Sequence, residues 1–292
     1  LRGKSQGAEK RLTRMDFRNG RSLDLSSPVI MGIINTTPDS FYPGSRVPDP
    51  RTAVERAMEM LDSGASIIDI GGESSRPGAG AIDWQEEVRR VVPVVRGIRE
   101  RRPEAIISVD TYNCNTALQA LSEGADIVND ITGLVDPAMI EVVAKNGAAV
   151  VIMHMKGTPS TMSRLTDYSD VVSQVKEQLL ERCEKAVAGG VRKDGIILDP
   201  GIGFAKNALQ SLEILKNITD FTCLKYPVLV GHSRKSFMGY VSGLPVENRL
   251  EETLAVSTYL YLKGVKILRV HDVEEHRRIF DILKLMDKST EQ

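Results

Sequence analysis

The chain has 292 residues, of which 38 are basic and 39 acidic, so its net charge is close to zero. A nucleic-acid or membrane-surface protein would be expected to carry a basic excess, and no apolar run approaches the roughly 18 residues of a membrane span. The three cysteines, Cys114, Cys183 and Cys223, are odd in number and widely spaced. They indicate free thiols of a reducing, cytoplasmic compartment, and neither a disulfide framework nor a zinc site.

The amino-terminal segment, residues 1–14, is rich in basic residues and lacks an apolar core like that of a signal peptide. We interpret it as a disordered tail or a remnant of processing, and residues 15–292 as a single domain. Residues 15–25 alternate between apolar and polar around Asn19-Gly20, a two-residue turn signal that predicts a β-hairpin. We expect this hairpin to close the bottom of the barrel that the following elements predict.

Eight short runs rich in β-branched residues follow, and each of them ends in polar residues. They lie at 29–34, 66–70, 105–109, 126–128, 148–153, 195–198, 227–230 and 265–268. After the first run comes the sequence Asn-Thr-Thr-Pro-Asp-Ser-Phe at 35–41. Because the polar residues follow only one end of each run, the pattern predicts buried strands whose carboxyl ends share a functional edge.

Segments with helical spacing separate these runs. Apolar residues recur at i, i+3 and i+4 in 52–63, which is typical of an amphipathic helix. Further helices are predicted at 85–101, 115–123, 137–145, 169–188, 209–221, 248–262 and 273–285. Strict alternation of strands and helices requires parallel strands, and eight units in about 250 residues predict an α/β fold, the (β/α)8 TIM barrel. An open doubly wound sheet is the alternative, but the Gly-x-Gly-x-x-Gly turn typical of it does not follow the first strand.

In such a barrel the reactive groups come from the carboxyl ends of the strands. Asp110, Asn129 and Asp199 supply acceptors there, and such groups can bind the N–H edge of a flat heterocycle such as a pterin or a guanine. Arg76, Lys235 and Arg269 supply positive charge that would suit a phosphate.

Several of these residues also have a plainer interpretation. Asp110 and Asp199 could be N-caps of the helices that follow them. His154 could be a core histidine with satisfied nitrogens, and His276 is expected to face solvent from within a helix. The Gly-His-Ser-Arg-Lys sequence at 231–235 differs from a nucleophile elbow because lysine occupies its fifth position.

Eight motifs, one after each predicted strand and in order from Phe17 to the end, resemble those of the dihydropteroate synthase family. The motifs lie at 35–41, 69–77, 108–111, 129–130, 153–155, 198–204, 233–236 and 269–272. The resemblance implies a transferase of folate biosynthesis. The reaction implied by the resemblance condenses 6-hydroxymethyl-7,8-dihydropterin pyrophosphate with para-aminobenzoate to give 7,8-dihydropteroate and pyrophosphate. The resemblance also implies Mg²⁺ as cofactor, a homodimer and binding of sulfonamides.

The resemblance assigns roles to individual residues. The pterin site would contain Asp110, Asn129, Met153, Asp199, Gly203, Lys235 and Arg269. The pyrophosphate site would contain Asn35, Ser75, Arg76, Arg269 and His271, with Asn35 also binding the metal. The para-aminobenzoate site would contain Phe41, Ser75, Pro77, Phe204, Lys235 and Ser236. Catalytic roles would fall to Asp39, Arg76, Asp110, Lys235 and Arg269.

One loop departs from the family pattern. Many members have Ser-Asp-Gly-Gly after Asp-Ser-Phe, whereas this chain has Tyr-Pro-Gly-Ser-Arg at 42–46. Pro43 replaces a carboxylate that could steady a cation, and Asp39 could take that role. We expect the segments 36–46 and 74–84, which are rich in Pro, Gly and Ser, to close over pyrophosphate and Mg²⁺ before para-aminobenzoate binds.

The chemistry of the strand ends agrees with this family. Pyrophosphate is a leaving group best assisted by a metal and fixed cations. If it leaves early, the amine can attack a methylene cation without a protein nucleophile, and the strand ends show no convincing Ser–His or Cys–His pair. Three alternatives remain: a methyltetrahydrofolate–corrinoid methyltransferase, a Schiff-base aldolase with Lys235 as nucleophile, and a non-catalytic pterin-binding protein.

Overall fold

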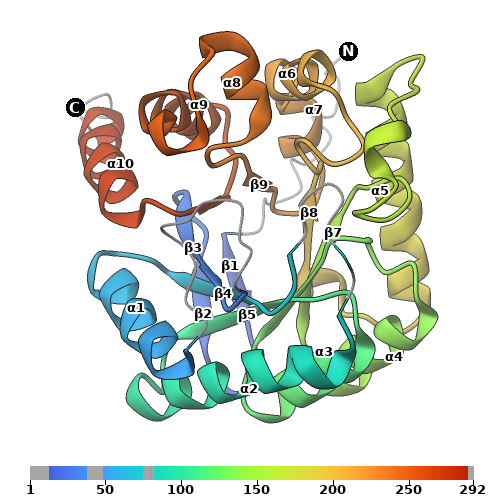
Figure 1. Ribbon diagram of the computed structural model, residues 1–292, viewed down its shortest axis with the longest axis vertical. Helices are drawn as coiled ribbons and strands as arrows, with labels where there is room; N and C mark the ends of the chain where they lie inside the picture. The colour runs from blue at the N-terminus through green and yellow to red at the C-terminus, as the bar shows by residue number, and fades with distance from the viewer. Residues whose placement is uncertain (1–12, 38–48, 75–79, 81, 289–292) are drawn as a thin grey trace, which may run out of the picture.

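Eight parallel strands form the centre of the structure, and helices surround them (Figure 1). The computed structural model describes residues 13–37, 49–74, 80 and 82–288. The strands are β3 (Val29–Asn35), β4 (Ile67–Gly71), β5 (Ile106–Asp110), β6 (Ile127–Asp130), β7 (Ala149–Met153), β8 (Ile196–Asp199), β9 (Leu229–Gly231) and β10 (Ile267–Val270). They pair in the order β8-β7-β6-β5-β4-β3-β10-β9. A parallel bridge between Leu198 and Val228 brings the two ends of this sheet together. The predicted TIM barrel is confirmed.

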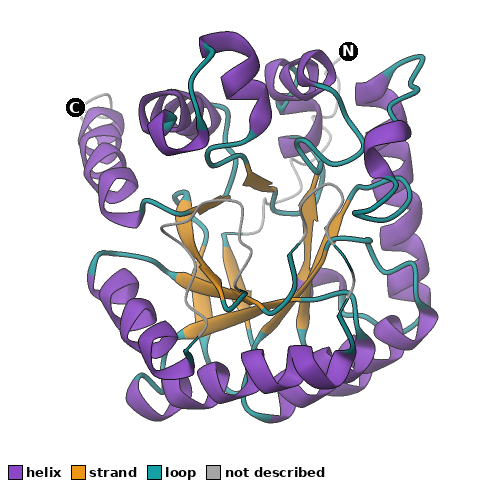
Figure 2. Ribbon diagram, viewed as in Figure 1, coloured by secondary structure: helices purple, strands orange, loops and turns teal. Residues whose placement is uncertain are grey.

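Helices separate the strands along the chain and lie outside them (Figure 2). They are α1 (Pro50–Asp62), α2 (Trp84–Arg101), α3 (Cys114–Ser122), α4 (Pro137–Asn146), α5 (Val171–Ala188), α6 (Ala208–Lys216), α7 (Thr219–Thr222), α8 (Ser236–Ser242), α9 (Leu250–Leu262) and α10 (Val273–Lys288). The helix predicted at 209–221 is two helices, because Asn217 ends α6 and its side chain donates to the carbonyl oxygen of Glu213. Helix α8 was not predicted, since seven residues are too few to show a period. In the described part of the chain, no helix has the length and apolarity to span a membrane.

Side-chain caps explain where several of these helices begin. Asp49 accepts a hydrogen bond from the backbone N–H of Thr52 at the start of α1, and Pro50 occupies the first turn. Asp136 and Pro137 repeat this arrangement at the start of α4. Proline fits the first turn because its missing N–H has no partner there in any case.

The amino-terminal hairpin consists of β1 (Arg14–Asp16) and β2 (Ser22–Asp24), which pair antiparallel. The backbone N–H of Phe17 donates to the carbonyl oxygen of Arg21 at 2.8 Å, so three residues form the loop where two were predicted. Gly20 closes it at a φ of 76°, in the left-handed region that favours glycine. Four hairpin side chains, Met15, Phe17, Leu23 and Leu25, form one cluster with interior residues of the barrel strands. The hairpin therefore closes the bottom of the barrel, as predicted.

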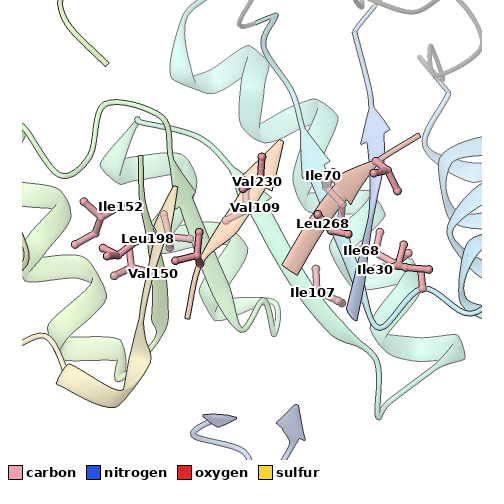
Figure 3. Close-up of a cluster of buried hydrophobic side chains, with 14 of the residues drawn as sticks. Ile30, Ile68, Ile70, Ile107, Val109, Val150, Ile152, Leu198, Val230 and Leu268 are labelled. Atoms are coloured by element: carbon pink, nitrogen blue, oxygen red, sulfur yellow. The ribbon is translucent and has the colours of Figure 1, made fainter. Parts of the chain in front are cut away.

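Alternation along the strands divides their side chains into two sets. One set packs outward against the helices, and Figure 3 shows part of it, including Ile68, Ile70, Ile107 and Val109. The other set faces the barrel interior and changes character along the strands. Nearest the hairpin lies the apolar layer: Met31, Ile67, Ile106, Ile127, Ala149, Val151, Ile197, Leu229 and Ile267. Toward the carboxyl ends lies the polar layer: Asn35, Asp69, Ser108, Asp110, Asn129, Asp199 and Arg269.

Candidate active site

Neighbouring strands bring the predicted site residues to one level of the barrel. Asn35 pairs with Gly71, Gly71 with Asp110, and Asp110 with Asn129. Gly71 contributes no side chain between its neighbours. A Cβ atom there would lie 3.6 Å from the Cβ of Asp110 and 3.7 Å from Oδ1 of Asn35. Asn35 and Asp110 thus flank one open position on the interior face.

Arg269 joins two carboxylates of the polar layer. Its Nε donates to Oδ2 of Asp69 at 2.6 Å, and its Nη2 donates to Oδ2 of Asp110 at 2.5 Å. Asp69 is fully buried, and its Oδ2 also accepts from Nδ2 of Asn129 at 3.2 Å. Because the amide group of Asn129 donates to Asp69, its oxygen remains an acceptor for a ligand. Asp69 therefore orients both Arg269 and Asn129.

Burial shifts the protonation equilibria of these groups. It raises the pKa of Asp110 to about 7, although the Arg269 guanidinium opposes the shift. It likewise raises the pKa of Asp199, and there Lys235 opposes it. The pKa of Lys235 falls to about 8 because burial outweighs the attraction of Asp199. Burial also disfavours the charged form of Arg269, but Asp69 and Asp110 together raise its pKa.

Asp199 and Lys235 meet at the turn that follows β8. Oδ1 of Asp199 accepts from the backbone N–H of Gly201 at 2.7 Å. Nζ of Lys235 donates to the carbonyl oxygen of Ile202 at 2.5 Å and lies 4.5 Å from the centre of the Phe204 ring. Gly203 has a φ of 78°, and a Cβ there would lie 3.4 Å from Cδ of Lys235. The turn thus places an aromatic ring and a carbonyl group against the lysine.

An apolar cluster borders this turn. Met153 and Phe204, both predicted site residues, belong to it. Its other members are Ile131, Met155, Met162, Ala205 and Tyr112. The cluster gives the site an apolar wall beside its polar layer, and this combination suits a ligand that is both flat and rich in N–H groups.

The loops after β9 and β10 are joined to each other. Arg234 is a buried side chain that pairs with both carboxylate oxygens of Asp272 at 2.9 and 2.8 Å. Oγ of Ser233 lies 2.9 Å from Nδ1 of His271, so the strand ends do contain a Ser–His pair, which was not expected from the sequence. Burial lowers the pKa of His271 to about 3, so this imidazole is neutral and would bind an anion through an N–H group. Arg234 supports the loops, while Arg269 of the polar layer and Lys235 beside it are the cations near the acceptors of the site.

The structure excludes the N-cap interpretation of Asp110 and Asp199. The N-cap of α3 is Asn113 and that of α6 is Asn207. Neither aspartate caps the following helix, which favours the functional interpretation of both.

The two histidine expectations have opposite outcomes. His154 is fully buried, with Nε2 3.0 Å from Oε1 of Gln178 and Nδ1 2.9 Å from Nζ of Lys206. The core interpretation is confirmed. The prediction that His276 faces solvent is wrong, because its side chain is fully buried and its Nε2 lies 2.8 Å from Oγ of Ser257. His276 falls on the same face of α10 as Val273 and Phe280, both of which are buried, and this i, i+3, i+7 spacing marks the core side of a helix.

Some predicted site residues cannot be placed. Asp39, Phe41, Ser75, Arg76 and Pro77 lie outside the described residues, and so does Pro43. The closing of the segments 36–46 and 74–84 therefore stays a prediction. Ser236 is described, and it lies exposed at the first position of α8, next to Lys235.

Two buried charged residues beside the site received no role from the sequence. In the sequence analysis Asp69 appears only as part of a motif. An aspartate inside the apolar run at 66–70 nevertheless indicates a buried ion pair, because a buried carboxylate needs a partner. Lys206 follows the motif at 198–204 and is also buried. Nothing in its local sequence indicates that its ammonium group is enclosed.

Comparison with known proteins agrees with this geometry. The family described as pterin binding enzyme matches residues 31–271. A dihydropteroate synthase of Escherichia coli strain K12 is 41% identical over 259 residues, which is 89% of this chain and 92% of that protein. A Yersinia pestis dihydropteroate synthase in complex with a sulfonamide drug superposes with a TM-score of 0.91 at 37% identity, covering 94% of this chain and 99% of the other. For a Xanthomonas albilineans dihydropteroate synthase with 4-aminobenzoic acid the TM-score is 0.87 at 35% identity, with 94% and 98% covered.

A TIM barrel whose carboxyl edge combines buried carboxylates, an amide and two cations is suited to an enzyme that binds an N–H-rich heterocycle together with an anion. The likeness extends over most of both chains at well above 30% identity. The chain belongs to the pterin-binding enzyme family and, within it, to the dihydropteroate synthases.

Proposed function

We propose that this chain condenses 6-hydroxymethyl-7,8-dihydropterin pyrophosphate with para-aminobenzoate, giving 7,8-dihydropteroate and pyrophosphate. The observation that carries the proposal is the polar layer itself. Asp110, Asn129 and Asp199 present acceptors to the barrel interior beside Lys235 and Arg269. The pterin ring offers several N–H donors on one edge, and buried carboxylates that accept them add both affinity and orientation.

Loss of pyrophosphate is the first chemical step of the proposal. Arg269 would turn part of its guanidinium toward the anion, while His271 would bind it from the loop after β10 and Asn35 from the end of β3. Positive groups fixed in a dry site stabilise the charge that develops on the leaving group. The carbon–oxygen bond to pyrophosphate breaks, and the pterin keeps a methylene cation.

Attack by para-aminobenzoate is the second step. Its amine would form the new carbon–nitrogen bond and release a proton to solvent or to the departing anion. Phe204, Lys235 and Ser236 line the described part of this subsite, with the Lys235 ammonium against the Phe204 ring. The similar Yersinia pestis enzyme forms a complex with a sulfonamide drug, and we propose that sulfonamides compete with para-aminobenzoate for the subsite of this chain.

Mg²⁺ is part of the proposal and fits the residues that the structure describes. Those residues contain no group of three His, Cys, Asp or Glu side chains that could hold a metal. Mg²⁺ needs only one or two protein oxygens when substrate phosphates and waters complete its shell. Asn35, whose Oδ1 lies at the level of Asp110, would supply one. When bound, the ion would neutralise charge on pyrophosphate.

The direct test is product formation from the two substrates with Mg²⁺. Formation of 7,8-dihydropteroate with one pyrophosphate per turnover supports the proposal, and no product refutes it. Pterin binding without product would favour a non-catalytic binding protein. Methyl transfer from methyltetrahydrofolate to a corrinoid would favour the methyltransferase.

The aldolase alternative predicts a different chemical signature. The lowered pKa of Lys235 would also suit a Schiff-base lysine. Borohydride reduction in the presence of carbonyl substrates would then modify Lys235 covalently. We expect no such adduct, because Lys235 donates to the carbonyl oxygen of Ile202 and pairs electrostatically with Asp199.

We also propose that the chain forms a homodimer through α9 and α10, which lie side by side (Figure 1). Large apolar side chains are exposed on both helices: Tyr259, Leu262, Ile282, Leu285 and Met286. Burial of these side chains against a second copy would remove apolar area from water. Sedimentation should show a dimer that Leu262→Glu dissociates, and a wild-type monomer would refute this part.

The cytoplasm is the location that we propose for the chain. Cys114, Cys183 and Cys223 are all unpaired, which suits a reducing compartment. Fractionation of cells that produce the protein would test this.

A further inference from the structure

Lys206 is a buried lysine that the proposed reaction does not use. Its side chain is 6% exposed. Nζ lies 2.9 Å from Nδ1 of His154, 2.9 Å from the carbonyl oxygen of Phe204 and 3.0 Å from that of Gly201. The carbonyl oxygen of His154 is a fourth neighbour at 3.3 Å. The amine is thus enclosed by acceptors from two loops, one after β7 and one after β8.

The hydrogen bonds of His154 define the protons around Lys206. Nε2 of His154 faces the carbonyl-type oxygen of Gln178, which can only accept, so the imidazole proton is on Nε2. Nδ1 then carries a lone pair and accepts from Lys206. A neutral amine would direct its own lone pair at one of four acceptors, whereas an ammonium donates to three of them. Burial lowers the pKa of Lys206 well below its usual value, and the carboxylate of Asp199 opposes this shift only in part. The enclosure of Nζ by four acceptors is therefore the observation that favours the ammonium form.

The turn that Lys206 holds has an unusual backbone. The φ angles are 67° at Gly201, 78° at Gly203 and 49° at Ala205, all in the left-handed region. This region is unfavourable for Ala205 because alanine has a Cβ atom, whereas glycine has none. A Cβ at Gly201 would lie 2.0 Å from the carbonyl oxygen of His154, so the two backbones are in direct contact. The ammonium of Lys206 bridges them.

This turn presents three groups to the active site. The N–H of Gly201 donates to Asp199, the carbonyl oxygen of Ile202 accepts from Lys235, and the ring of Phe204 lies against the same ammonium. Lys206 binds the carbonyl groups of residues 201 and 204, on either side of Ile202. One lysine thus fixes the segment against which a second, Lys235, is placed.

We propose that Lys206 is a positioning residue for the para-aminobenzoate subsite: its ammonium sets the turn at 201–205, and the turn sets Phe204 and Lys235. The inference rests on the proposed function for its kinetic consequences, although not for its structural ones. It requires that the positive charge at Nζ, and not the packing of the alkyl chain, holds the turn.

The kinetic test compares wild type with Lys206→Ala. This substitution removes a group equivalent to n-propylammonium, which can be added back from solution. We expect the KM for para-aminobenzoate to rise roughly 10- to 100-fold, because a small misplacement of binding groups has effects of this size. The KM for the pterin substrate should rise less, since β8 also holds Asp199. Added n-propylammonium should lower the KM for para-aminobenzoate again, whereas 1-propanol and tetramethylammonium should not. Lys216→Ala, at an exposed position of α6, is the matched control.

A second measurement does not depend on the reaction. The amide of Phe204 donates to the carbonyl oxygen of Gly201 at 3.1 Å, and Lys206 holds that same oxygen. Hydrogen exchange of this amide in the ligand-free protein should be faster in Lys206→Ala and slower again with n-propylammonium. Absence of product with wild type would refute the proposed function, and the exchange result would still decide the role of Lys206.

Several results would overturn the inference. One is a folded Lys206→Ala protein with wild-type KM and wild-type amide exchange. Another is a raised KM that n-propylammonium leaves unchanged, because packing and not charge would then be responsible. If Lys206→Ala does not fold, Lys206→Gln replaces it with a neutral side chain of similar length. Failure of both variants to fold would assign Lys206 to the stability of the barrel and not to the subsite.

Discussion

The apolar and polar layers of the barrel interior lie on the same strands, yet they have opposite tasks. Along β4, Ile67 belongs to the apolar layer and Asp69, two residues on, to the polar layer. The hairpin seals the first layer, which buries apolar area and stabilises the fold. The second layer contains carboxylates and the guanidinium of Arg269, whose burial costs free energy unless they are paired. The comparison shows that residues that stabilise this barrel and residues proposed to bind substrate can lie only two positions apart on one strand.

Arg269→Ala should have the largest effect on the polar layer. It leaves Asp69 and Asp110 without their shared cation, and we expect turnover to fall about 100- to 1,000-fold. Burial already raises the pKa of Asp110 against the pull of Arg269, so without this cation the Asp110 carboxyl should bind a proton more tightly in the folded than in the unfolded state. Its contribution to stability is then greatest at low pH and is lost as the pH rises through its folded pKa.

Thermal melts at pH 5 and pH 8, together with turnover, would test this variant. We expect the melting temperature of the variant to lie further below that of wild type at pH 8 than at pH 5. Arg269→Lys is the control, because it keeps the positive charge but cannot donate in the planar guanidinium geometry to Asp69 and Asp110. Normal turnover and normal pyrophosphate affinity in Arg269→Ala would place the anion site elsewhere.

Leu25→Ala should affect stability and leave the chemistry alone. Leu25 is fully buried beneath the apolar layer, and such a substitution costs about 2–5 kcal/mol of unfolding free energy. Urea denaturation would measure the loss, and kcat/KM should stay close to wild type at a temperature where the variant is folded. Leu118→Ala, at a position 45% exposed on α3, should change stability by less than about 0.5 kcal/mol. A large drop in kcat/KM for Leu25→Ala would show that the layers are not independent.

The pH profile gives the smallest and most graded effect. Protonation of Asp110, whose pKa is about 7, removes an acceptor on the acid side. Loss of the Lys235 proton, with a pKa of about 8, removes a cation on the alkaline side. We therefore expect kcat/KM to be highest between these values and to fall roughly tenfold per pH unit beyond them. In Lys235→Arg the alkaline limb should move upward, and a flat wild-type profile from pH 6 to pH 9 would contradict both assignments.

The architecture could be predicted almost completely from the sequence, because the alternation of strands and helices repeats eight times. The same alternation placed Asp110, Asn129 and Asp199 at strand ends. The alternation of strands and helices does not predict which side chains pair with one another. Arg269 meets Asp69 across 200 positions, and this contact depends on the register between β10, β3 and β4, which local patterns do not encode.

The errors have a physical cause as well. His276 was expected to face solvent from within a helix, but its spacing from Val273 and Phe280 places it on the buried face of α10. Lys206 resembles any lysine near a helix start, and only the left-handed turn before it folds carbonyl groups around its ammonium. The roles of Asp39, Phe41, Ser75, Arg76 and Pro77 stay predictions, since these residues lie outside the described part of the chain.

The most direct test of the central claim, that the polar layer binds the pterin through its carboxylates, is calorimetric titration of a pterin ligand into wild type and Asp199→Asn. Oδ1 of Asp199 accepts from the N–H of Gly201, so the oxygen of the asparagine must keep that bond and its NH2 group must face the N–H donors of the pterin. A mispaired buried group costs about 1–3 kcal/mol, and we expect pterin affinity to fall by the corresponding factor of roughly 5 to 150. Unchanged affinity in a folded Asp199→Asn protein would contradict the account.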